Sequence, residues 1–198
     1  MRHFINVCVL AIATSAMFIY GEENDMTATL SGKKALMIIA AEGFQDDEFS
    51  KPCNLLTGLG ATVKVACSRR EATGVFGREI KADLLLNECK ADDYDAVIFV
   101  GGPGATEYFD NAQAWTLARE AVSKDKVLGA ICIAPAILAN AGILKGRKAT
   151  SFPSEQGRLA ARGAQVVRQN VVIDGQIVTA IGPQAAKEFA EALAKLLQ

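Results

Sequence analysis

Histidine is almost absent from this sequence, since His3 is the only one among 198 residues. Imidazole is the most common metal ligand in proteins and the usual base near neutral pH. Its absence excludes most metal chemistry and every mechanism that needs a histidine base inside the domain. A basic excess is also missing, because 21 Lys and Arg residues face 22 Asp and Glu residues. We therefore expect no metal, no cofactor and no nucleic-acid partner.

Paired cysteines are missing as well. The five cysteines are Cys8, Cys53, Cys67, Cys89 and Cys132, and no two of them form a CxxC motif. An odd number of widely spaced cysteines predicts neither a disulfide framework nor a zinc site. The sequence also has no internal repeat and no low-complexity segment.

The first 30 residues form a separate extension. Residues 4–20 are apolar, follow Arg2 and precede a polar run, which fits a secretory signal peptide that ends between about residues 16 and 25. Alternatively, translation starts at Met26 and the protein is cytoplasmic. The apolar run is short for a membrane span, so stable membrane insertion of the mature domain is not expected. Residues 31–198 have the length of one full-sized domain.

Apolar runs and helical patterns alternate along residues 31–198. The runs at 35–41, 62–66, 96–100 and 127–131 predict buried strands, and 74–86 predicts a hairpin or edge strand. Short strands are expected at 149–152 and 165–168, and residues 171–180 predict two strands joined at an Asp-Gly turn. Helices are expected at 48–59, 111–123, 135–141, 184–197 and, from a serine cap, 154–162. This alternation predicts a three-layer α/β/α sandwich with a mostly parallel sheet, as in flavodoxin-like folds.

Cys132 ends one of the predicted buried strands. Pro135 follows three residues later and marks the first turn of a helix, so strand and helix are joined by a tight turn. A thiol in such a nucleophile elbow faces helix N–H groups, which should lower its pKa. The alternative is a small hydrophobic residue at the end of a strand.

Three segments resemble the ThiJ/PfpI superfamily, whose members have a class I glutamine amidotransferase-like fold. They are AICIAPAILANAGILKGRKATSFP at 130–153, AAEGFQDDEFSKP at 40–52 and VIFVGGPGA at 97–105. The resemblance extends over residues 33–197. It implies that Cys132 is the reactive cysteine and that Glu48 is the acid that hydrogen-bonds it. Without the resemblance, Glu48 reads as a solvated acid in the first turn of a helix.

The glycine loop supplies further candidates. Backbone N–H groups of Gly101 and Gly102, together with that of Ile133, are expected to bind a developing oxyanion. An ordinary tight turn is the alternative, and a phosphate cradle lacks the GxGxxG spacing. Asp46 and Asp47 are interpreted as acids that favour the start of a helix. The cysteines at 53, 67 and 89 are expected to be structural, with Cys89 in a polar loop and open to oxidation.

One residue departs from the resemblance. PfpI-type members carry a histidine after the cysteine, where this chain has Ile133, and Phe152 occupies another position at which some relatives have histidine. A cysteine peptidase is therefore the weakest hypothesis. The resemblance implies instead a cofactor-free enzyme acting on reactive aldehydes or glycated proteins, of the glyoxalase III or deglycase type. The alternative is a redox-sensing stress-response protein or chaperone that uses the same thiol. A homodimer or higher homo-oligomer is expected from the resemblance.

Overall fold

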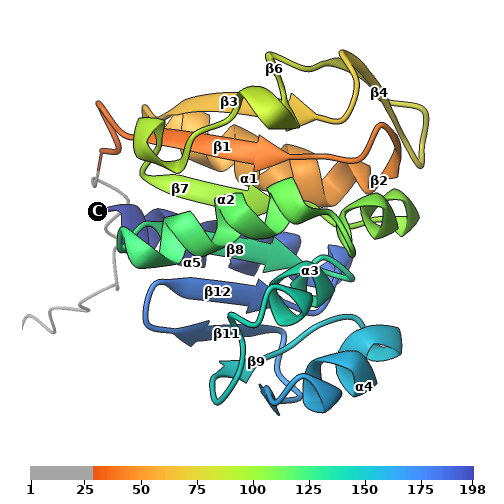
Figure 1. Ribbon diagram of the computed structural model, residues 1–198. Coiled ribbons are helices and arrows are strands. Elements are labelled where there is room, and N and C mark those ends of the chain that lie inside the picture. Colours follow the sequence, from red (N-terminus) through yellow and green to blue (C-terminus); the bar gives the residue numbers. More distant parts are fainter. Residues whose placement is uncertain (1–28) are drawn as a thin grey trace, which may run out of the picture.

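A computed structural model describes residues 29–198, and the predictions for the first 28 residues lie outside this range. Seven strands form the central sheet in the order β11-β12-β8-β7-β1-β3-β6 (Figure 1). Only β11 is antiparallel to its neighbour. The bounds are β1 Lys34–Ile38, β3 Thr62–Cys67, β6 Leu84–Leu85, β7 Ala96–Phe99, β8 Val127–Ile131, β11 Val171–Asp174 and β12 Ile177–Ala180. The predicted mostly parallel sheet is confirmed.

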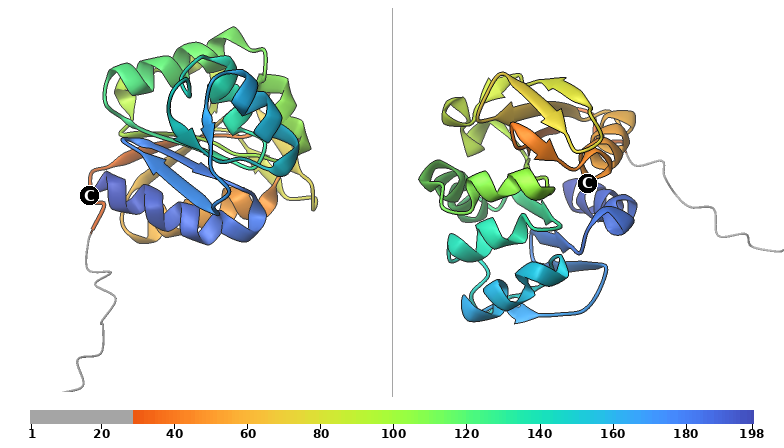
Figure 2. Two further views of the ribbon diagram at one scale, coloured as in Figure 1. Left: turned by 90° about the horizontal axis from the view of Figure 1, so that it is seen from below. Right: turned by 90° about the vertical axis from the view of Figure 1, so that its right-hand side faces the viewer.

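Helices cover both faces of this sheet, as Figure 2 shows in the view from below. Helices α1 (Asp46–Gly58) and α5 (Ala186–Leu197) pack together on one face. The other face carries α2 (Ala112–Ser123), α3 (Pro135–Asn140) and α4 (Pro153–Ala161). Each face buries its own hydrophobic cluster against strands that have almost no exposed residues. Burial on both faces explains why the sequence shows continuous apolar runs instead of alternation. The predicted three-layer sandwich is confirmed.

Smaller elements accompany the central sheet. Strands β2 (Glu42–Phe44), β4 (Glu71–Gly74) and β5 (Glu79–Lys81) form a second sheet, in which β4 and β5 are a hairpin. The pair β9 (Lys148–Ala149) and β10 (Gln165–Val166) forms a third. Short 3₁₀ helices occur at Leu86–Glu88 (η1), Ala91–Asp93 (η2), Pro103–Tyr108 (η3) and Pro183–Ala185 (η4).

The structure differs from the sequence predictions at β2 and at the start of α4. Strand β2 was not predicted, because three residues are too few to show a periodic pattern. The serine cap expected for α4 is wrong: the helix begins at Pro153, and its cap residue Phe152 makes no side-chain cap hydrogen bond. Proline supplies the helical φ at the first position and lacks the N–H that a cap would satisfy.

None of the helices within residues 29–198 has both the length and the apolar character that a membrane span requires.

Candidate active site

Cys132 stands directly after β8, at the carboxyl edge of the sheet. Its φ is +63°, a left-handed conformation that is unusual for any residue except glycine. Its N–H donates to the carbonyl of Ala180 on the neighbouring strand, at 2.9 Å, and its own carbonyl accepts from the N–H of Phe152, at 2.7 Å. These two bonds hold the turn, and Pro135 begins α3 three residues later. The sharp strand-to-helix turn predicted for this cysteine is present.

Glu48 lies in the first turn of α1. The side chain of Gln45 caps this helix by accepting from the N–H of Glu48, at 2.8 Å. The carboxyl group of Glu48 is turned inward and is fully buried. Within residues 29–198, neither of its oxygens makes a hydrogen bond that meets the usual distance and angle. The interpretation of Glu48 as a solvated acid is therefore wrong, because the side chain has no access to solvent.

The backbone of Gly101 lies against both the Cys132 side chain and the Glu48 carboxyl group. A Cβ atom on Gly101 would be 2.5 Å from Cβ of Cys132 and 2.5 Å from Oε2 of Glu48. These two atoms are therefore no more than about 5 Å apart. A methyl group at this position would overlap both side chains, so only glycine allows the acid and the thiol to meet.

Burial governs the proton affinities of this pair. It raises the pKa of Glu48 to about 8, although the side chain of Cys132 and the backbone of Gly101 lower it in part. The pKa of Cys132 is raised to about 12, first by burial and then by the charge of Glu48. The expected lowering of the thiol pKa is therefore wrong. Helix α3 has only six residues, so its positive end does not offset the cost of placing a thiolate in a buried site. The first proton is lost near pH 8 and belongs to the pair.

Three backbone groups were predicted to form an oxyanion hole, and they face different partners. The N–H groups of Gly102 and Ile133 point at the sulfur of Cys132 and favour its charged form. The N–H of Gly101 faces the carboxyl group of Glu48. Gly102 has a φ of +97°, and its Cα lies against the backbone of residues 43–45, where a side chain has no room. The oxyanion-binding role of all three groups remains a prediction.

Asp46 has a structural role that the sequence did not reveal. Its carboxylate is buried and accepts from the N–H groups of Phe76, at 2.9 Å, and Arg78, at 3.2 Å. It therefore fixes the turn of the β4–β5 hairpin against the start of α1. Its neighbour Asp47 is exposed and forms an ion pair with Lys51, at 3.0 Å. The interpretation as helix-start acids describes Asp47 well but is incomplete for Asp46.

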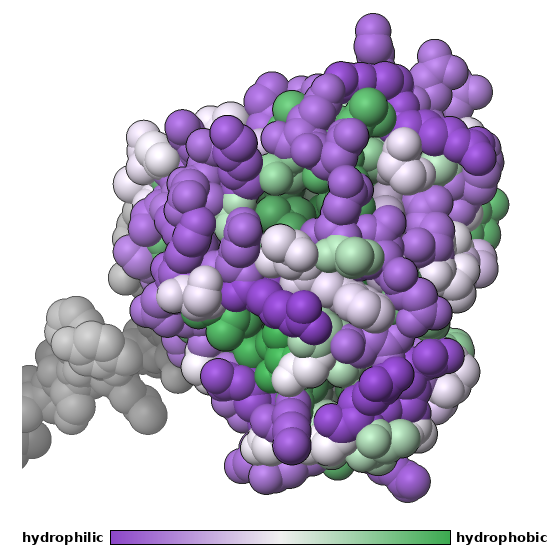
Figure 3. Space-filling model, viewed as in Figure 1, coloured by the Kyte–Doolittle hydropathy of each residue, from purple (hydrophilic) through white to green (hydrophobic). Residues whose placement is uncertain are grey.

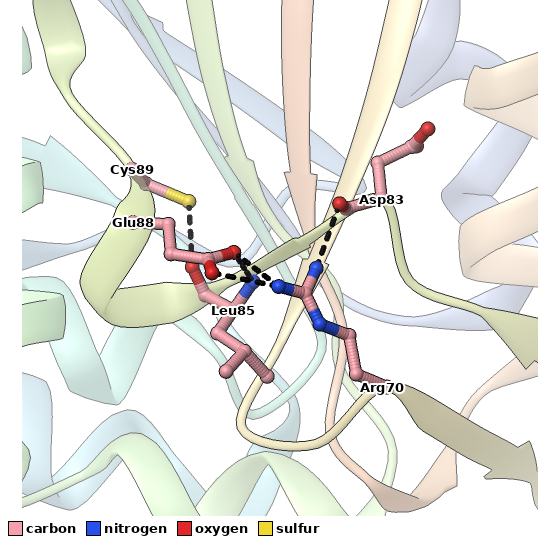
Figure 4. A network of polar contacts seen from close by, with 5 residues as sticks. All are labelled: Arg70, Asp83, Leu85, Glu88 and Cys89. Atoms are coloured by element: carbon pink, nitrogen blue, oxygen red, sulfur yellow. Dashed lines mark hydrogen bonds and ion pairs between the residues drawn. The ribbon is translucent and has the colours of Figure 1, made fainter.

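The remaining cysteines of the described chain are away from this site. Cys67 is buried at the end of β3, and Cys53 is half-buried on α1, where burial raises its pKa. Cys89 is also half-buried, and its thiol donates to the carbonyl of Leu85, at 3.4 Å (Figure 4). Burial and the nearby Glu88 raise the pKa of Cys89 to about 11. The expectation of an exposed Cys89 is therefore wrong, and its oxidation remains a prediction.

Cys89 also lines a cavity of about 300 Å³ between α2 and the loop from η1 to η2. This cavity opens on the face shown in Figure 3, where apolar atoms lie in hollows among hydrophilic ones. Nearby, Arg70 binds both Glu88, at 2.6 Å, and the carbonyl of Asp83, at 2.9 Å, and so fixes the loop (Figure 4). No cluster of three or more metal-ligating side chains occurs within residues 29–198.

A flavodoxin-like sandwich with a buried cysteine at a sharp strand-to-helix turn, set against a buried acid, places the chain among α/β proteins that carry a cysteine at this turn. A model of the DJ-1/PfpI family matches residues 33–196. The chain therefore belongs to the DJ-1/PfpI family, as the sequence motifs predicted.

Individual relatives agree with this assignment. The chain is 33% identical over 196 residues to an uncharacterized protein of Methanocaldococcus jannaschii, covering 97% of this chain and 96% of that protein. It is 31% identical over 164 residues to a protein of Pyrococcus horikoshii named deglycase, covering 82% of this chain and 99% of the relative. The crystal structure of a ThiJ/PfpI domain protein from Brachyspira murdochii superposes with a TM-score of 0.81 at 32% identity, covering 84% of this chain and 98% of the other.

Proposed function

We propose that this protein is a cysteine-dependent, cofactor-free enzyme that converts reactive α-oxoaldehydes, free or bound to protein amines, into 2-hydroxy acids. The observation that carries the proposal is the packing of the buried Glu48 carboxyl group against Cys132 across Gly101. An acid with a pKa of about 8 exchanges protons readily near neutral pH, which suits a general acid–base group. The name deglycase of the Pyrococcus horikoshii relative is consistent with this chemistry.

In the first step, Sγ of Cys132 forms a bond to the aldehyde carbon. The thiol proton passes to the Glu48 carboxylate and from there to the carbonyl oxygen, which gives a hemithioacetal. Because the thiol is a weak acid here, attack and proton transfer to Glu48 are coupled. The N–H groups of Gly102 and Ile133 stabilise charge that develops on oxygen.

In the second step, Glu48 removes the hydrogen of the former aldehyde carbon as a proton and returns it to the adjacent carbonyl carbon, while the hydroxyl proton of the hemithioacetal passes to the oxygen of that adjacent carbonyl. The first carbon is oxidised and the second is reduced, so no external redox partner is needed. The product is a thioester of a 2-hydroxy acid, and water cleaves it to release the acid and the free thiol. One water is consumed in each turnover.

Methylglyoxal supplied without glutathione tests the proposal, with lactate as the measured product. We expect lactate formation by the native protein and none above background by Cys132→Ser. The matched control is Cys89→Ser, which also loses a half-buried thiol but lies away from the site and should keep full activity. If the native protein and Cys132→Ser form lactate equally slowly, the proposal is wrong.

A redox sensor is the second candidate function. The two oxygens of the Glu48 carboxyl group favour it, because neither has a hydrogen-bond partner in the described chain. A protonated Glu48 has no conventional partner in the described chain and can donate a hydrogen bond to a sulfinate on Cys132. Two molecules of peroxide would each transfer one oxygen to sulfur and leave as water. Intact-mass analysis after mild peroxide treatment should then show two added oxygens on Cys132. Oxidation of Cys89 with an unmodified Cys132 would exclude this function.

A further inference from the structure

The backbone of Phe152 lies against that of Cys132, the residue that we propose as the nucleophile. Its N–H donates to the carbonyl of Cys132 at 2.7 Å, so the two backbones are in direct contact. Phe152 caps α4 and keeps 41% of its surface exposed, whereas most phenylalanines of the described chain are buried. An exposed aromatic ring has no stabilising role in the core, so its position at the rim of the site calls for another explanation.

The ring is directed along the carboxyl edge of the sheet. Its Cδ2 atom is 3.5 Å from the point where a Cβ on Gly182 would lie, and Gly182 follows the strand that receives the N–H of Cys132. Ile133 follows Cys132 directly in sequence and is only partly buried. Apolar side chains therefore adjoin the cysteine at both of these positions.

The charged groups that act on the site are carboxylates. The negative charge of Glu48 raises the pKa of Cys132, and that of Asp47 raises the pKa of Glu48. Within residues 29–198, no cationic side chain forms an ion pair with the Glu48 carboxyl group, whose oxygens have no hydrogen-bond partner. A substrate that carries its own carboxylate would lose hydration in this buried site without gaining a compensating ion pair.

We propose that Phe152 is a specificity-determining residue that selects neutral α-oxoaldehydes with an apolar or aromatic substituent over anionic ones. This inference rests on the proposed function, because it concerns the second substituent of the aldehyde that Cys132 attacks. An aromatic substituent stacks on the Phe152 ring while the aldehyde carbon reaches the thiol. Such ring pairs contribute roughly three- to tenfold in affinity.

Three substrates test the inference: phenylglyoxal, methylglyoxal and 4,5-dioxopentanoate, an α-oxoaldehyde that carries a carboxylate, each corrected for the rate with Cys132→Ser. For the native protein we expect kcat/KM to be highest for phenylglyoxal and lowest for 4,5-dioxopentanoate. Phe152→Ala should lower the ratio of kcat/KM for phenylglyoxal to that for methylglyoxal by about three- to tenfold, whereas Phe152→Tyr should keep it. The matched control is Ile173→Ala, which removes another exposed apolar side chain, on the edge strand β11, and should leave the ratio unchanged.

A variant that introduces a positive charge should reverse the preference. Phe152→Lys places a cation at the rim and should raise kcat/KM for 4,5-dioxopentanoate about tenfold relative to phenylglyoxal. If the native protein consumes none of the three aldehydes, the proposed function itself fails. If it consumes them and the ratios are the same in Phe152→Ala, Phe152→Lys and the native protein, the role of Phe152 is wrong while the proposed function stands.

Discussion

The N–H of Gln45 donates a hydrogen bond to the carbonyl of Gly101, at 3.0 Å. The same Gln45 caps α1 through its side chain and so orients Glu48 at the start of the helix. One residue thus ties the acid-bearing helix to the glycine loop that packs against both the acid and the thiol. The distance between Glu48 and Cys132 is therefore set by main-chain contacts and not by the two side chains alone.

The first prediction follows from the space at Gly101. In Gly101→Ala the added methyl group would lie 2.5 Å from both Cβ of Cys132 and Oε2 of Glu48, and 2.7 Å from the carbonyl oxygen of Ile131. The loop must shift, which should lower the free energy of unfolding by about 1–3 kcal/mol and remove more than nine-tenths of the activity. Urea unfolding and the methylglyoxal assay measure the two effects.

Gly157→Ala is the matched control for this substitution. Gly157 lies inside α4, and no atom is within 4 Å of the position of its added Cβ. Alanine is the better helix former, so this variant should gain about 0.5–1 kcal/mol in stability at unchanged activity. Equal effects of the two substitutions would contradict the close approach at Gly101.

A second prediction concerns the pH dependence of activity. The reactive form of the pair has one proton shared between Glu48 and Cys132, and the doubly protonated form has no base. Because the first proton leaves near pH 8, kcat/KM should rise by up to about tenfold per pH unit between pH 6 and 8 and then level off. Glu48→Gln should lower kcat/KM by about 10²-fold or more and remove this rise. A native profile that is flat from pH 6 to 8 would contradict the assignment of Glu48 as the base.

The raised pKa of Glu48 also predicts how stability varies with pH. The folded state keeps the proton until about pH 8, whereas the unfolded state loses it near the ordinary value of 4.5. Above pH 4.5 the folded state therefore binds more protons, and its stability falls as pH rises, by at most about 1.4 kcal/mol per unit. Denaturant unfolding from pH 5 to 8 should show this fall for the native protein. Glu48→Gln carries no titrating proton and should show a flatter curve, and parallel curves would refute the burial of an acid at this position.

The sequence predicted the sheet because strands buried on both faces appear as apolar runs, such as residues 96–100 and 127–131. The turn at Cys132 was predictable because Pro135 marks the start of a helix. The pairing of Glu48 with Cys132 was available only from the resemblance, since no local pattern records a contact between segments so far apart. The shift of the Cys132 pKa was predicted in the wrong direction, because burial depends on the packing of the whole site. Asp46 was missed because its partners are backbone N–H groups, which every residue carries.

The last prediction separates the two adjacent acids at the start of α1. Asp46→Ala leaves the N–H groups of Phe76 and Arg78 without their acceptor, which should cost about 1–3 kcal/mol of stability. Asp47→Ala removes only an exposed ion pair with Lys51, which should cost less than about 0.5 kcal/mol. Amide hydrogen exchange provides a local readout, because the amides of Phe76 and Arg78 should exchange faster in Asp46→Ala and at the native rate in Asp47→Ala. Equal exchange in both variants would mean that the hairpin is held by its strands alone, and Asp46 would then have no role in fixing the turn.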